Sequence, residues 1–141
     1  MSEEQVKPLK WEPDPTVGYT VVRREDGGMQ VTFNDIDLET LKHWRDFALE
    51  HLLDSDRLTR NLYDLRQLSQ IPDSAINFAL EANSDPSARN IRLAVVVSNE
   101  TVRESVAKIT AMTTFGSARI KVFTSMAEAE TWLSRPLSTL V

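Results

Sequence analysis

The second half of this chain alternates between two kinds of apolar pattern, and this alternation most restricts its fold. Three short runs have the pattern of strands, at 60–65, 91–97 and 119–123, and the second contains a continuous apolar stretch. Each run precedes a segment whose apolar residues recur every three or four positions, as on one helix face, at 73–83, 99–112 and 125–133. Strands that alternate with helices form parallel sheets joined by crossover helices. The pattern therefore predicts an α/β domain.

The first half adds a hairpin and one further helix. Tyr19–Arg24 and Met29–Phe33 are rich in β-formers, and Glu25–Gly28 between them supplies two glycines for a tight turn. A helical period follows Asp37, a good N-cap residue, and continues to about Leu52. The predicted order is ββαβαβαβα: a mostly parallel sheet of four to five strands, with an antiparallel edge strand and about four helices.

Length and composition agree with a single water-soluble domain. Within the 141 residues we expect a flexible leader at 1–16, an α/β domain at 17–134 and a short tail at 135–141. The chain lacks cysteine, which excludes disulfides and thiolate catalysis. Its net charge of −5 and scattered basic residues argue against nucleic-acid binding. No window approaches the roughly 20 apolar residues of a membrane span, so we expect no membrane insertion and a cytoplasmic location.

Three segments of the chain carry a resemblance to a known family. They are Asn61–Leu65, Ile91–Val97, and Ile120–Ser125 leading into Glu128-Ala129 and Trp132-Leu133. In this order they resemble the STAS-like family, whose best-known members are bacterial anti-sigma-factor antagonists, and especially an uncharacterised bacterial branch of that fold. The resemblance extends from about Val17 to Leu133. It implies a STAS-like fold and a regulatory function that depends on binding a protein partner.

The resemblance also draws attention to Ser74. In the regulatory members an Asp-Ser pair begins the helix after the third strand, and the partner kinase phosphorylates that serine. Asp73-Ser74 stand at a similar position here, although Ala75-Ile76 follow them in place of a small residue and a glycine. The free N–H groups at a helix N-terminus favour a phosphate. Ser74 is therefore a candidate phosphorylation site, and a helix-capping role is the alternative.

The residue types that usually carry catalysis do not form a recognisable site. His43 and His51 are eight positions apart on one helix, so they differ by about 80° in direction and about 12 Å in height. They cannot share a metal ion, and Glu39 and Asp46 place His43 on a solvated, charged face. The glycines match no phosphate-binding loop, and no serine stands in G-x-S-x-G. We expect a protein that is not an enzyme, with no catalytic residue, cofactor or metal.

The longest loop beyond the carboxyl end of a predicted strand spans residues 66–74. In open parallel sheets, ligands and partners meet such loops. This loop mixes polar residues with Leu68 and Ile71, and exposed apolar residues among polar ones are typical of a protein contact. Our leading hypothesis is a non-catalytic protein-interaction module, whose partner is another protein or a second copy in a homodimer. The predicted partner-binding residues are Arg66, Gln67, Leu68, Ser69 and Ile71. A loop folded onto its own core is the alternative.

A second hypothesis is that the chain carries or senses a small apolar ligand. The same broad fold resembles that of lipid-transfer domains. We predict an apolar pocket between the helices and the sheet, lined by Phe78, Leu80, Met112, Phe115 and Trp132. The alternative is that these residues are ordinary core, since large apolar side chains are usually buried.

Overall fold

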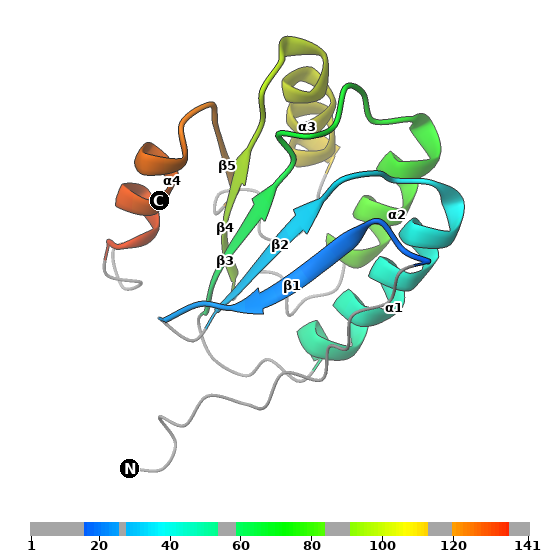
Figure 1. Ribbon diagram of the computed structural model, residues 1–141, viewed down its shortest axis with the longest axis horizontal. Coiled ribbons are helices and arrows are strands. Elements are labelled where there is room, and N and C mark those ends of the chain that lie inside the picture. Colours follow the sequence, from blue (N-terminus) through cyan, green and yellow to red (C-terminus); the bar gives the residue numbers. More distant parts are fainter. Residues whose placement is uncertain (1–15, 26–27, 54–58, 84–90, 113–119, 136–141) are drawn as a thin grey trace.

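A computed structural model (Figure 1) describes residues 16–25, 28–53, 59–83, 91–112 and 120–135. Most of the predicted leader and tail, the middle of the first turn and Phe115 lie outside the described residues. The elements are β1 (Tyr19–Arg23), β2 (Met29–Phe33), α1 (Leu38–Leu53), β3 (Thr59–Asp64), α2 (Asp73–Asn83), β4 (Ile91–Val96), α3 (Glu100–Met112), β5 (Ile120–Phe123) and α4 (Met126–Leu133). The predicted single-domain α/β class is confirmed.

The strands form one mixed sheet of order β1-β2-β3-β4-β5. β1 pairs antiparallel with β2, and the hairpin closes with a 2.8 Å hydrogen bond from the Arg24 N–H to the Gly28 carbonyl. The remaining neighbours pair in parallel. Each of α1, α2 and α3 connects one parallel strand to the next in the same direction along the sheet. Because such crossovers share one hand, the three helices lie on one face (Figure 1).

Side-chain alternation along the strands divides the core into two layers. In β1 to β4, odd-numbered residues such as Val31, Tyr63 and Val95 belong to the cluster that packs against α1, α2 and α3. The even-numbered Leu62, Ala94 and Val96 point to the other face, where they pack against Ala129 and Leu133 of α4. β4 is therefore covered on both faces, as its continuous apolar run predicts.

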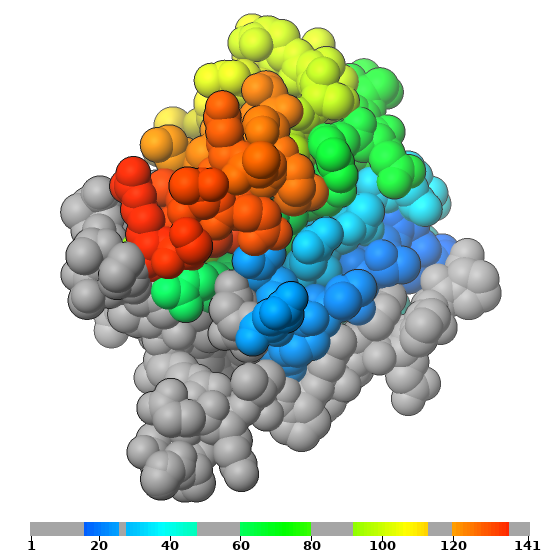
Figure 2. All heavy atoms as spheres, turned by 60° about the vertical axis from the view of Figure 1, so that its left-hand side comes forward, coloured from blue at the N-terminus to red at the C-terminus, as the bar shows by residue number. Residues whose placement is uncertain are grey.

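α4 covers only part of its face of the sheet. Figure 2 shows β1 and β2 at the surface beside it. On the same face as α4, Thr20 and Val22 of β1 are exposed, and Gln30 and Thr32 of β2 are half-buried. Thr20, Gln30 and Thr32 are the polar residues expected on the solvated face of a strand, whereas Val22 is apolar and 61% exposed.

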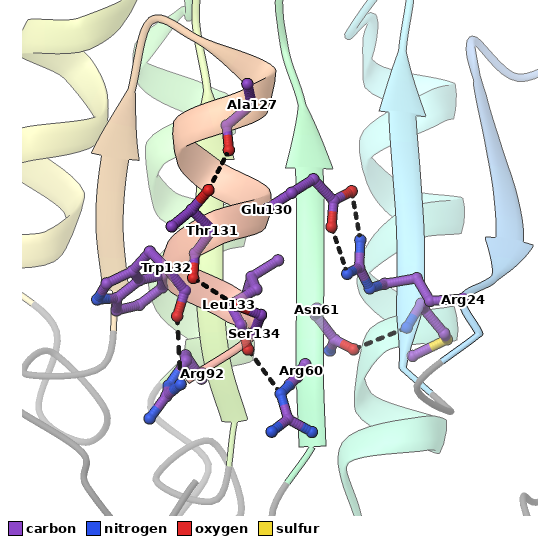
Figure 3. Close-up of polar contacts among 11 residues, drawn as sticks. Arg24, Arg60, Asn61, Arg92, Ala127, Glu130, Thr131, Trp132, Leu133 and Ser134 are labelled. Atoms are coloured by element: carbon purple, nitrogen blue, oxygen red, sulfur yellow. Dashed lines mark hydrogen bonds and ion pairs between the residues drawn. The ribbon is translucent and has the colours of Figure 1, made fainter. Parts of the chain in front are cut away.

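The C-terminal end of α4 is attached to the sheet by two arginines (Figure 3). Arg92, which is buried, donates through Nη1 to the carbonyls of Trp132 at 3.3 Å and Arg135 at 2.7 Å. Arg60 donates through Nε to the Leu133 carbonyl at 2.6 Å. The last carbonyls of a helix have no partner within the helix and carry the negative end of its dipole. The two guanidinium groups donate hydrogen bonds to carbonyls at this end of α4 and place positive charge beside the negative end of its dipole.

Side-chain caps set the starts of three helices. The Asp37 Oδ1 accepts the Thr40 N–H at 2.8 Å, and this bond holds the pKa of Asp37 below its ordinary value. The Asn99 Oδ1 accepts the Val102 N–H at 2.8 Å, and the Ser125 Oγ accepts the Glu128 N–H at 3.2 Å. Each cap stands where its residue type predicts. Within the described ranges, each helix is too short or too polar to cross a bilayer.

Candidate functional site

An apolar cavity of about 90 Å³ lies between the sheet and the layer formed by α1, α2 and α3. The sheet side of its wall consists of Phe33, Tyr63, Leu65, Leu93, Val95 and Ile120. The helices and loops contribute Ile36, Leu41, Trp44, Leu68, Ile71, Ala75, Ala79, Val106, Ile109 and Thr110. No charged side chain is among these wall residues, so the site suits an uncharged, apolar ligand.

Two alanines on α2 explain why this space is not filled. Ala75 and Ala79 are four positions apart and therefore lie on one face of the helix, toward Val106 and Ile109 of α3. A larger aliphatic side chain at either position would extend into the cavity. The half-buried wall residues mark where the cavity approaches solvent, and the other wall residues are buried. They are Ile36, Tyr63, Ile71, Ala79, Leu93, Thr110 and Ile120.

Tyr63 places a hydroxyl group among the apolar wall residues. The Trp44 Nε1–H donates to the Tyr63 Oη at 3.3 Å, and the two rings meet edge to face at 83° with centroids 6.1 Å apart. The Thr110 hydroxyl donates to the Val106 carbonyl of its own helix at 2.9 Å. Tyr63 and Thr110 are therefore the hydroxyl groups with which a bound molecule can form hydrogen bonds.

Burial of the Tyr63 hydroxyl makes the stability of the folded protein decrease at high pH. Loss of hydration of the phenolate raises the pKa of Tyr63 to about 12, and the Trp44 hydrogen bond opposes this only in part. The unfolded tyrosine has a pKa of about 10. Because the folded state holds this proton more tightly, we expect the free energy of unfolding to fall by up to about 3 kcal/mol as pH rises from about 10 to about 12. Urea denaturation at a series of pH values measures this decline, and Tyr63→Phe should remove the part that is due to Tyr63. An identical decline in Tyr63→Phe would assign it to other groups.

The cavity lies between helices and sheet as predicted, but the predicted lining residues do not form it. Trp132 is on the opposite face of the sheet, against Phe123 and the Arg92 guanidinium. Met112 is 55% exposed. Phe78 is one position away from Ala79, so it points toward α1, where the Arg45 guanidinium lies 5.2 Å from its ring centroid. The prediction is therefore wrong for these three residues. The Leu80 side chain and Phe115 lie outside the described residues.

The predicted partner-binding loop has an inner and an outer side. Leu68 is only 6% exposed and Ile71 is half-buried, and both line the cavity. The interpretation of Leu68 as an exposed apolar anchor is therefore wrong, because the loop folds onto the core. Arg66, Gln67 and Ser69 are exposed on the outer side of the loop.

Polar contacts hold this loop in place. The Asp64 carboxylate accepts two hydrogen bonds from the Arg66 guanidinium, at 3.0 and 2.9 Å, and these lower the pKa of Asp64. From the neighbouring β4–α3 connection, the Ser98 Oγ donates to the Arg66 carbonyl at 2.7 Å and the Asn99 Nδ2 donates to the Leu68 carbonyl at 3.2 Å. The outer side of the loop is thus presented by a fixed backbone.

Ser74 lies at the second position of α2 and does not cap it. The N–H groups of Ala75 and Ile76 point to the Pro72 carbonyl, at 3.0 and 3.3 Å, so the helix begins after Pro72. Ser74 is exposed, and among the described residues its hydroxyl takes part in no hydrogen bond. The capping alternative is therefore wrong, and phosphorylation of Ser74 stays a prediction.

His43 is not on a fully solvated face. It is half-buried, and its Nδ1 lies 2.7 Å from the hydroxyl oxygen of the buried Tyr19. The side chain of His51 lies outside the described residues. Among the residues that are described, no three His, Asp or Glu side chains lie close enough together to hold a metal ion.

Comparison with known proteins bears on the fold alone. No protein-family model matches the sequence, and no curated protein matches it significantly. Among solved structures, the NMR structure of the protein TM1081 is similar over 92% of this chain and 98% of that chain, with a TM-score of 0.59 and 14% sequence identity. At this identity the similarity supports the α/β fold and carries no activity, ligand or partner.

Proposed function

We propose that this chain binds a small apolar ligand in the cavity between its sheet and α1–α3, as a sensor or carrier of that ligand. The observation that carries this proposal is the cavity itself, which is about 90 Å³ in volume and is lined almost entirely by apolar side chains. Apolar cavities of roughly 150 Å³ take up benzene, whereas pockets for drug-sized molecules measure about 300–1,000 Å³. At about 90 Å³ this cavity is smaller than both, so the ligand is small: a short alkyl chain, or a single ring that extends beyond the cavity past its half-buried wall residues.

Filling the cavity from α2 tests this function. We expect Ala79→Leu to weaken the binding of ethylbenzene by about tenfold or more, because the leucine side chain occupies the same space. Cavity-filling substitutions commonly add about 0.5–2 kcal/mol to the free energy of unfolding, so this variant should stay folded. NMR titration with ethylbenzene measures affinity, and urea denaturation measures stability.

Ala107→Leu is the matched control for this experiment. It makes the same substitution on an exposed position of α3 and should leave ethylbenzene affinity within about twofold of the parent. Undiminished binding by a folded Ala79→Leu variant would place the ligand elsewhere and overturn the proposal.

A second candidate function is the non-catalytic protein-interaction module implied by the STAS-like resemblance. The fixed backbone of the 66–74 loop favours it, because Arg66, Gln67 and Ser69 are exposed together with the unbonded hydroxyl of Ser74. A preordered surface loses little conformational freedom on binding. Native and denatured mass spectrometry of the freshly purified protein distinguishes the candidates: a retained apolar ligand favours the cavity, and a bound protein or a phosphate favours the module.

A further inference from the structure

We propose that the cavity selects ligands that carry an uncharged hydrogen-bond acceptor, such as a carbonyl or ether oxygen, which receives the hydroxyl hydrogen of Tyr63. This inference deepens the proposed function and rests on it. It assigns Tyr63 as the residue that determines ligand specificity.

The direction of the Trp44–Tyr63 hydrogen bond leaves the tyrosine hydrogen unused. An indole N–H can only donate, so the Tyr63 Oη is the acceptor in the 3.3 Å contact. Within the described part of the chain, the Tyr63 hydroxyl takes part in no other hydrogen bond. Its hydroxyl hydrogen therefore stays available in an apolar site, where an unsatisfied donor costs free energy.

The other polar group on the wall does not compete for this hydrogen. The Thr110 hydroxyl donates to the Val106 carbonyl on α3, whereas Tyr63 contacts Trp44 of α1. Among the described residues no acceptor receives this hydrogen, and a bound molecule or solvent can supply one. An oxygen on the ligand that receives this hydrogen gains a hydrogen bond that a pure hydrocarbon cannot form.

The apolar wall restricts the acceptor to an uncharged group. Among the described residues that line the cavity, none carries a charge that could pair with a carboxylate or a phosphate. An ionised group would lose its hydration without compensation. A ketone, aldehyde, ester or ether with a small hydrocarbon body meets both conditions.

Acetophenone and ethylbenzene test the inference as a pair of probes. Both have a benzene ring and a two-carbon substituent, and only acetophenone has an acceptor. We expect Tyr63→Phe to lower the affinity for acetophenone relative to ethylbenzene by about three- to tenfold, the effect of one net hydrogen bond. NMR titration gives both dissociation constants, with the indole signal of Trp44 as the reporter and that of Trp132, on the opposite face of the sheet, as the internal control.

The outcomes separate this inference from the function on which it rests. If both probes bind and Tyr63→Phe leaves their relative affinity unchanged, the inference is overturned and the ligand-binding function stands. If neither probe binds the parent protein up to its solubility, both are overturned. If Tyr63→Phe does not fold, a measurement on the parent protein alone tests the hydrogen bond. The carbonyl ¹³C signal of bound acetophenone should then lie downfield of its position in hexane. An unshifted signal contradicts the hydrogen bond.

Discussion

Leu68→Asp is expected to lower the free energy of unfolding by about 4 kcal/mol or more and to leave little folded protein. Leu68 is 6% exposed and lies on the wall of the apolar cavity. An aspartate there would lose its hydration with no cation beside it, because the Arg66 guanidinium already binds Asp64. Since typical domains are stable by only about 5–15 kcal/mol, a loss of this size is a large part of the total. Urea denaturation followed by circular dichroism measures it.

Ser69→Asp is the matched control, because it introduces the same carboxylate at the adjacent, exposed position. We expect its free energy of unfolding to stay within about 0.5 kcal/mol of the parent. A Leu68→Asp protein as stable as Ser69→Asp would mean that Leu68 is exposed in solution. The loop would then be a surface with an apolar anchor, and the cavity would lack one of its walls.

Leu68 also shows where prediction from the sequence ends. Alternating strand and helix patterns predicted every described element, because the periods of two and three to four residues are local properties of the sequence. A loop has no such period, so nothing local indicates which of its side chains turn inward. The hydrogen bonds from Ser98 and Asn99 that hold the loop against the core come from 31 or 32 residues further along the chain.

The sequence predicts a pocket between helices and sheet but not the residues that line the cavity, for a related reason. The predicted walls are large apolar side chains, whereas the small side chains of Ala75 and Ala79 line the cavity on α2. The four-residue spacing of these alanines is visible in the sequence. The sequence does not show that these alanines oppose Val106 and Ile109 of α3, because that depends on how two helices pack on the sheet. The sequence does not indicate the role of the Tyr63 hydroxyl, because its partner Trp44 lies on α1 whereas Tyr63 lies on β3.

One segment links the two candidate functions. The inner side chains of the 66–74 loop, Leu68 and Ile71, line the cavity, and its outer side chains Arg66 and Ser69 face solvent. A ligand that contacts the inner side therefore touches the same backbone that presents the outer surface. The two proposed functions would therefore use opposite sides of one segment.

Replacement of Arg92 by methionine is expected to lower the free energy of unfolding by about 3 kcal/mol. Arg92 is 2% exposed, and its Nη1 donates to the Trp132 carbonyl near the end of α4 (Figure 3) and to the Arg135 carbonyl just after the helix. Methionine fills much of the space of the arginine stem, so the loss reflects mainly the hydrogen bonds and the charge. A buried ion can be replaced by an apolar residue at little cost when its partners are replaced too. Here the partners are backbone carbonyls, which remain and lose a donor.

Two further variants identify the cause of this loss. Arg103→Met makes the same change on an exposed position of α3 and should stay within about 0.5 kcal/mol of the parent. Arg92→Lys keeps the positive charge beside the negative end of the α4 dipole, but an ammonium group lacks the planar geometry of the guanidinium. We expect it to recover part of the loss. Equal stability of Arg92→Met and Arg103→Met would show that Arg92 does not hold α4 to the sheet, and that Ala129 and Leu133 suffice.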